Sequence, residues 1–150
     1  MDLIKCEKQF ISQPKKPIVV NRNEKQKFYL SAPELKAVFE VFFSVSLRMP
    51  EDFSLGLMYD NFLLFRCNGF HGTTSKGFFS SEHHAYPHSH ILTANDIENG
   101  RIKKPSLIAD LTGKYIDLDG AKLFFFNQCG IIGYERYFPE TRQISLFRKE

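Results

Sequence analysis

Several features that often identify a function at once are missing from this sequence. Only three cysteines occur, at positions 6, 67 and 129, and no two of them form a Cys-x-x-Cys pair. This scarcity argues against a disulfide framework and indicates reduced thiols in a cytoplasmic protein. Cys129, at a predicted helix end, is better explained as buried packing than as a catalytic nucleophile.

Long apolar runs are also missing. No segment approaches the roughly twenty apolar residues that a membrane-spanning helix needs. The first ten residues, MDLIKCEKQF, are too mixed in polarity for a signal peptide. We therefore expect a cytoplasmic location without a membrane partner. Tryptophan is absent too, which decides nothing about function.

A strong excess of one charge is likewise absent. The net charge is +3, with lysine pairs at 15–16 and 103–104. This balance is compatible with a phosphate-bearing partner such as nucleic acid. Most surface lysines are simply solvated, however, so the charge alone does not identify the partner.

Apolar residues are plentiful enough for one core. They make up 43% of 150 residues and include sixteen phenylalanines. We expect a single α+β domain over residues 1–150, built on a small, mostly antiparallel sheet with two or three helices.

The first half of the chain predicts two helices and two short strands. Apolar spacing favours a helix over 2–12, and strands are expected at 17–20 and 27–30. Ser-Ala-Pro-Glu (31–34) has the form of a capping box and precedes apolar residues at i, i+3, i+4 and i+7, which favours a helix from 35 to about 48. The competing interpretation is a strand, because VFEVFFSVSL is rich in β-branched and aromatic residues.

The second half predicts a hairpin, a further strand and a helix. Residues 53–69 read as two strands joined at Asp60-Asn61, and 89–94 as another strand. A helix is expected within 117–130, with Asp117 or Asp119 as its N-cap, Leu123 and Phe126 buried, and Gly130 as its stop. One or two strands should follow it.

The histidines are the sharpest signal. All five fall between positions 71 and 90, and none lies elsewhere. Any one loop histidine is most simply explained by a hydrogen bond to the backbone, and we leave His83 and His84 with that interpretation. Five within twenty residues indicate a site, for which His71, His88 and His90 are the candidates.

Strand alternation brings these histidines to other polar residues. Side chains two apart on a strand share a face. Leu64, Arg66 and Asn68 should then point one way, whereas Leu63, Phe65 and Cys67 point toward the core. If the strand with His88 and His90 lies alongside, Arg66, Asn68, His88 and His90 form one polar patch, with His71 at its rim.

Three interpretations of the polar patch compete. In the first, His88 and His90 act as base and acid on a phosphodiester, as in metal-free ribonucleases, and Arg66 stabilises the charge on phosphorus while Asn68 holds the substrate. In the second, His-x-His with His71 or His84 binds a divalent metal such as zinc. No carboxylate or cysteine ligand lies nearby, which weakens that interpretation. In the third, the histidines are structural.

The glycine-rich stretch GFHGTTSKGFF (69–79) resembles a phosphate-binding loop but lacks Walker A spacing. A plain flexible loop is the simpler interpretation. Gly69, Gly72 and Lys76 are nevertheless candidate substrate-binding residues, because glycine permits close approach to a ligand.

The strings FRCNGFHG, PHSHI, KKPSLIADLT and LDGAKLFFFNQCGI give the chain a family likeness over about residues 62–132. It resembles an uncharacterised bacterial and prophage family with an FR-x-NG-x-HG signature, a later H-x-H and a C-terminal helix ending in Cys-Asn or Cys-Gly. A looser likeness exists to TumE-type toxins of toxin–antitoxin pairs. Phe70 departs from the family's usual proline, and the loop from 72 to 87 is built differently. The shared positions are Arg66, Asn68, Gly69, His71, Gly72, His88 and His90.

The leading hypothesis is a toxin-like effector directed at RNA or another phosphodiester, a metal-independent ribonuclease without a cofactor. The alternatives are a non-catalytic inhibitor from a phage or mobile element that acts on a nucleic-acid-handling host system, and a histidine-ligated metal hydrolase. The resemblance implies a cognate antitoxin or a host defence protein as partner. The family has no settled activity, so it supports the site rather than a reaction.

Overall fold

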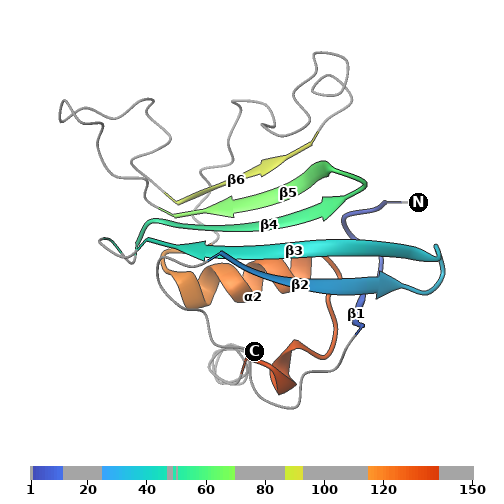
Figure 1. Cartoon of the computed structure of the whole chain (residues 1–150). Helices are drawn as coiled ribbons and strands as arrows, with labels where there is room; N and C mark the ends of the chain where they lie inside the picture. Colours follow the sequence, from blue (N-terminus) through green and yellow to red (C-terminus); the bar gives the residue numbers. More distant parts are fainter. Residues whose placement is uncertain are drawn as a thin grey trace.

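A computed structural model describes residues 2–11, 25–46, 49, 51–69, 87–92 and 115–138. Within these ranges the chain forms a six-stranded antiparallel sheet in the order β1 to β6, together with one α-helix, α2 (Figure 1). The α+β class is confirmed at this level, and the number of helices stays a prediction. The bounds are β1 Gln9–Phe10, β2 Lys25–Ala32, β3 Ala37–Val45, β4 Phe53–Tyr59, β5 Phe62–Asn68, β6 His88–Ile91, α2 Leu118–Gln128 and a 3-10 helix, η2, Tyr134–Arg136.

Helix α2 lies against one face of the sheet (Figure 1). The Asp117 carboxylate accepts a hydrogen bond from the Gly120 amide at 2.8 Å, as an N-cap should. Gly130, just after the helix, has φ +63°, a left-handed conformation that glycine adopts without strain. The predicted helix, its N-cap and its stop are therefore confirmed.

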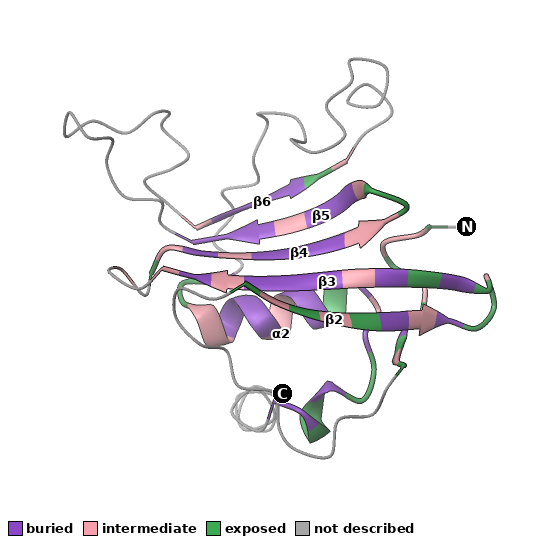
Figure 2. Cartoon of the chain, in the orientation of Figure 1, coloured by how far each residue is buried: buried purple, intermediate pink, exposed green. Residues whose placement is uncertain are grey.

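The core lies between α2 and the facing side of the sheet. Phe125 and Phe126 of the helix are fully buried, and Phe43 of β3 contacts both rings. Figure 2 shows buried residues along α2 and the central strands. Burying such a side chain stabilises the fold by about 1.5–3 kcal/mol. The sheet residues of this core are Leu30, Ala32, Ala37, Phe39, Val41, Phe43, Val45, Phe53, Leu55, Leu57, Leu64, Phe65 and Cys67.

The predicted helix at 2–12 is wrong. Residues 3–6 form turns and β1 pairs with β2. Lys8, which is fully buried, donates from Nζ to the carbonyls of Ile4, Cys6 and Cys129 at 2.7–2.8 Å. Its backbone forms a parallel bridge with Ile131. These long-range contacts satisfy the backbone of this segment and outweigh its weak local periodicity.

The predicted helix at 35–48 is also wrong, and the strand interpretation is correct as far as Val45. Phe39, Val41 and Phe43 are fully buried whereas Val38 is 56% exposed, so the pattern has the period of a strand. Ser31-Ala-Pro-Glu34 lies where β2 turns into β3, and the Leu35 amide donates to the Ala32 carbonyl at 3.1 Å. Chain reversal, rather than helix capping, is the role of this motif.

The hairpin at 53–69 is confirmed. Asp60 and Asn61 both have positive φ, 48° and 68°, as a two-residue type I′ turn requires. The strand expected at 89–94 occurs as β6, which begins one residue earlier and ends at Ile91. Residues 131–138 contain only the bridge at Ile131 and η2 instead of a strand. The strand expected at 17–20 and the residues after 138 lie outside the described ranges.

One detail of the alternation in β5 is wrong. Leu57 pairs with Phe65, but Met58 pairs with Leu63, so β5 has one extra residue at a bulge. Leu64 therefore joins the core, and Leu63 turns to the opposite side of the sheet beside Arg66. We call this side, which helix α2 does not cover, the open face.

Candidate functional site

The polar patch predicted from strand alternation is present on β5 and β6. These strands pair in antiparallel register, with Arg66 opposite His90 and Asn68 opposite His88. Since facing residues of neighbouring strands project from the same side of a sheet, all four side chains belong to one face. The structure therefore brings together Arg66, Asn68, His88 and His90.

Arg66 is held in place by two neighbours. Its Nε donates to Asn68 Oδ1 at 2.8 Å, and its Nη2 donates to Ser54 Oγ at 2.9 Å. The Ser54 hydroxyl in turn donates to Asn68 Oδ1 at 2.7 Å. Such bonds fix the plane of the guanidinium and leave Nη1 without a partner among the described residues.

The same hydrogen-bond network indicates which role the Nε2 atom of His88 plays, donor or acceptor. Because Asn68 Oδ1 accepts from Arg66 and Ser54, the Nδ2 end of the amide faces His88 Nε2, at 3.3 Å. An amide nitrogen can only donate, so His88 Nε2 is the acceptor and carries no proton. The rings of His88 and His90 meet edge to face, with centroids 5.0 Å apart.

Burial separates the roles open to the two histidines. Both histidines are buried, with exposed fractions of 1% for His88 and 9% for His90. A group that exchanges a proton with a substrate must come within hydrogen-bond reach of it. His90 is therefore the better placed of the two for contact with a ligand, and His88 for holding the network.

Tyr115, which sequence reasoning missed, joins the ends of both strands. Its hydroxyl lies within hydrogen-bonding reach of the Asn68 carbonyl, at 2.8 Å, and of the His88 carbonyl. The residue is buried and precedes α2. No sequence motif marks this contact, because it depends on where the helix meets the sheet.

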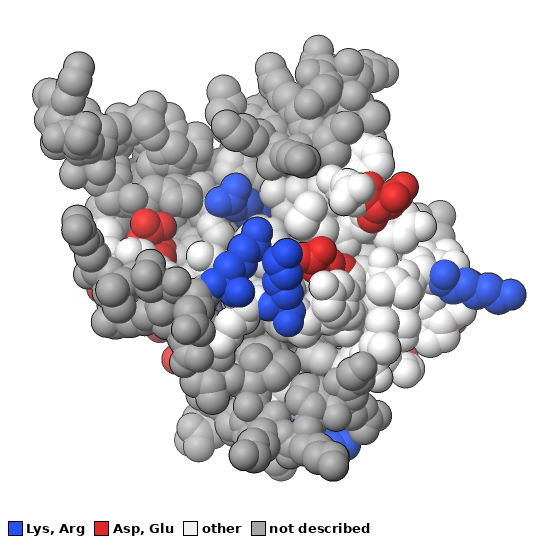
Figure 3. All heavy atoms as spheres, in the orientation of Figure 1, with Lys and Arg blue, Asp and Glu red and all other residues white. Residues whose placement is uncertain are grey.

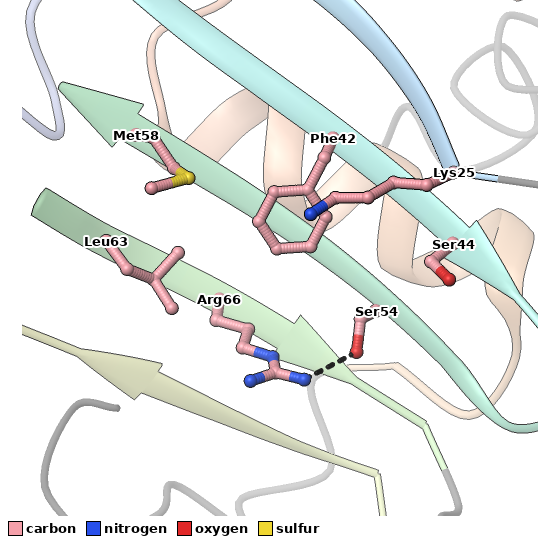
Figure 4. Close-up of a pocket in the computed structure, with 7 residues that line it drawn as sticks. All are labelled: Lys25, Phe42, Ser44, Ser54, Met58, Leu63 and Arg66. Atoms are coloured by element: carbon pink, nitrogen blue, oxygen red, sulfur yellow. Dashed lines mark hydrogen bonds between the residues drawn. The ribbon is translucent and has the colours of Figure 1, made fainter. Parts of the chain in front are cut away.

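A hollow of about 370 Å³ opens beside the polar patch (Figure 4). Arg66 and Ser54 belong to both features, whereas His88 and His90 do not line the hollow. Sequence reasoning missed the hollow, since its residues come from four strands. Its lining residues are Lys25, Phe42, Ser44, Ser54, Met58, Leu63 and Arg66.

Gly56 sets the floor of the hollow. It pairs with Phe42 on one side and Arg66 on the other. A Cβ atom at Gly56 would lie only 2.1 Å from Phe42 Cε1, so the ring lies down on the sheet because glycine is there. Lys25 Nζ lies 4.5 Å from the ring centroid, in a cation–π contact.

Positive charge gathers on the open face. Figure 3, in the orientation of Figure 1, shows lysine and arginine side chains close together near the middle of the view, with acidic side chains beside them. Burial lowers the pKa of Arg66, an effect that Asp52 partly offsets, yet a guanidinium stays charged at neutral pH. Burial also raises the pKa of Asp52, and Arg66 opposes this shift.

Of the remaining predicted site residues, the structure describes only Gly69. The Gly69 amide donates to the Phe53 carbonyl at 3.0 Å, and a Cβ here would lie 2.1 Å from the Glu51 carbonyl oxygen. Close packing of the chain accounts for this glycine without a ligand. The predicted site residues His71, Gly72 and Lys76, together with His83 and His84, lie outside the described ranges.

The thiols of Cys67 and Cys129 are buried and unsuited to nucleophilic attack. Burial raises the pKa of both, so both are protonated at neutral pH. Cys129 as packing is thereby confirmed. Across the described parts of the chain, no three or more His, Cys, Asp or Glu residues are grouped as metal ligands. The predicted zinc set included His71 or His84, which those parts do not contain.

Comparison with known proteins gives no match to a family model, to a curated protein or to a solved structure. In the portions of the chain that the structure describes, no helix is long and apolar enough to cross a membrane.

Proposed function

We propose that the protein is an RNA-directed effector that binds the phosphodiester backbone on its open face, with Arg66 as the main cation. The observation that carries this proposal is the fixed guanidinium of Arg66 at the edge of a hollow that Lys25 also lines. A guanidinium held in one plane matches two phosphate oxygens with little further loss of side-chain entropy.

The composition of the open face favours a single-stranded ligand. Tyr29 is on this face of β2 and is 52% exposed, and Phe42 underlies Lys25. Sheets that present aromatic and basic side chains bind single strands through stacking and phosphate contacts. A protein that recognises a duplex usually places a protruding helix or β-ribbon in one of its grooves. The described strands of the open face present neither.

Phosphodiester cleavage is the second candidate, and the pairing of His90 with Arg66 favours it. In this reaction an unprotonated imidazole removes the proton of a ribose 2′-hydroxyl, whose oxygen attacks phosphorus. The bond from phosphorus to the 5′-oxygen breaks, and a protonated imidazole gives that oxygen its proton. Arg66 would stabilise the charge that develops on the phosphoryl oxygens. His90 would take the proton from the 2′-hydroxyl and then give it to the 5′-oxygen, while His88 holds Asn68.

The direct test is fluorescence anisotropy of a labelled single-stranded RNA with the wild type and Arg66→Gln. Glutamine removes the charge but keeps a donor for Asn68. We expect Arg66→Gln to weaken binding roughly tenfold or more, as loss of a charged hydrogen bond does. Arg136→Gln, which removes the same charge from η2, is the control and should bind like the wild type.

The same RNA, followed on a gel, separates the alternatives. Cleavage that is lost in His90→Gln, with binding retained, supports the nuclease. Binding by the wild type without cleavage supports a non-catalytic binder. Cleavage that a chelator abolishes supports the metal hydrolase. Absence of RNA binding by the wild type contradicts the proposed function, and attention would move to the predicted antitoxin or host defence partner.

A further inference from the structure

The hollow on the open face has the size of a small-ligand site and two chemically different ends. Its volume is about 370 Å³, within the range of roughly 300–1,000 Å³ that small-molecule sites occupy. Figure 4 shows Met58 and Leu63 together at one end and Ser44 and Ser54 at the other, with Lys25 and Arg66 reaching in from opposite sides. A ligand that fills it must combine an apolar part with an anionic part.

The charged side chains of the hollow are available to an anion. In the described part of the chain Lys25 has no carboxylate partner, and its ammonium lies over the Phe42 ring. Lys27, two residues along the same strand, is instead paired with Glu40 at 3.3 Å. Two cations and the Ser44 hydroxyl can together serve the oxygens of a phosphate, which are more numerous than the two of a carboxylate. The Ser54 hydroxyl already donates to Asn68 Oδ1 and instead holds Arg66 in place.

The apolar end is suited to a flat ring. Met58 and Leu63 face each other across β4 and β5, because the bulge at Leu64 turns Leu63 to this side. The thioether of methionine adapts to irregular shapes and contacts aromatic rings favourably. Met58 is half-buried, so a ring placed here would cover the exposed part of its side chain, whereas Leu63 is already buried beside it.

We propose that the hollow is a subsite for one nucleotide of the bound RNA, with the phosphate between Lys25 and Arg66 and the base against Met58 and Leu63. This inference rests on the proposed function. It adds that one nucleotide is recognised, and it states which way the phosphate and the base point. Arg66 then links the hollow to the polar patch. Its guanidinium contacts the phosphate in the hollow, and its Nε donates to Asn68 of the polar patch.

Calorimetric titration with adenosine 5′-monophosphate, adenosine and inorganic phosphate tests the subsite. We expect the monophosphate to bind more tightly than either part alone. Lys25→Gln should weaken it roughly tenfold, the effect of losing one charged contact. Lys27→Gln, which removes the same charge outside the hollow, is the matched control and should change the affinity less than about twofold, as expected for an exposed ion pair.

Met58→Gln tests the orientation. It should weaken binding of the monophosphate while leaving that of inorganic phosphate unchanged, because only the base contacts residue 58. Equal losses in the two lysine variants would overturn the subsite, as would equal affinities for adenosine and its monophosphate. An unchanged affinity of Met58→Gln for the monophosphate would overturn the placement of the base.

Parallel anisotropy with RNA distinguishes failure of this inference from failure of the proposed function. RNA binding that depends on Arg66, without any binding of the monophosphate, overturns the subsite and leaves the proposed function standing. Absence of binding for both ligands overturns both.

Discussion

Gly56 determines how Phe42 lies on the open face. A Cβ at this position would come within 2.1–2.3 Å of two ring atoms of Phe42. We expect Gly56→Ala to lower the free energy of unfolding by about 1–3 kcal/mol, the usual cost of overpacking. Urea denaturation of the purified protein measures this change.

The control is a double-mutant cycle. In a Phe42→Ala background the ring is gone, so adding Gly56→Ala should cost little. If Gly56→Ala costs the same in both backgrounds, the ring is not what the glycine accommodates, and the account of the hollow's floor is wrong.

The buried cysteines predict how stability depends on pH. Burial raises the pKa of Cys67 above the ordinary thiol value of 9.0. Above that pH the unfolded chain loses this proton while the folded chain keeps it, so the free energy of unfolding falls as the pH rises. The slope is at most about 1.4 kcal/mol per pH unit for each such thiol.

Cys67→Ala isolates this effect. Denaturation of the wild type and the variant at pH 8 and pH 10 should show a shallower loss for Cys67→Ala, whatever its stability at neutral pH. The comparison with the variant is necessary because Lys8 has the opposite effect. Burial lowers the pKa of Lys8, so the folded chain releases this proton before the unfolded chain does, and the free energy of unfolding rises with pH. Identical slopes for wild type and variant would contradict the assignment.

At the scale of elements, the β4–β5 hairpin positions Arg66 and Asn68, and its turn depends on left-handed residues. Asn61 has φ +68° and is exposed. Valine at this position is strained, so Asn61→Val should destabilise the fold by about 1–2 kcal/mol. Asn61→Gly should equal or exceed the wild type in a thermal melt. A valine variant as stable as the glycine variant would show that the turn does not require this conformation.

Capping and turn residues in the sequence predicted their own helix and hairpin correctly, whereas apolar spacing alone did not distinguish helix from strand. Asp117 and Gly130 act within one turn of their own helix, and Asp60-Asn61 acts within its own hairpin, so each could be identified from neighbours in sequence. Residues 35–45 present apolar side chains at both helical and strand spacing, and only pairing with β2 and β4 selects the strand.

Long-range contacts explain the remaining differences. Lys8 can be buried because its ammonium donates a hydrogen bond of 2.7 Å to the Cys129 carbonyl. The two residues are 121 positions apart in the sequence, so no local pattern reveals this contact. The bulge that exchanges Leu63 and Leu64 depends on pairing with β4. The predicted meeting of Arg66 with His88 and His90 was accessible from sequence, because the bulge falls before Arg66 and leaves the later alternation intact. The hollow was not, because it needs the order of four strands.

At the scale of the whole molecule, one face of the sheet packs against the core and the other, the open face, carries the proposed binding site. Helix α2 and its phenylalanines cover the first (Figure 1). The second displays Lys25 and Arg66, together with Lys27 in its ion pair with Glu40, on strands held in register by pairing with their neighbours. A modest net charge of +3 is thereby compatible with a locally basic surface.

The measurement that tests this account most directly is the salt dependence of RNA binding by the wild type and Arg66→Gln. Each phosphate contact releases counterions, so loss of one contact lowers the slope of log K against log salt by about 0.7 for a single strand. We predict weaker binding and a shallower slope for Arg66→Gln, with Arg136→Gln unchanged. Equal slopes and affinities for all three proteins would contradict the account.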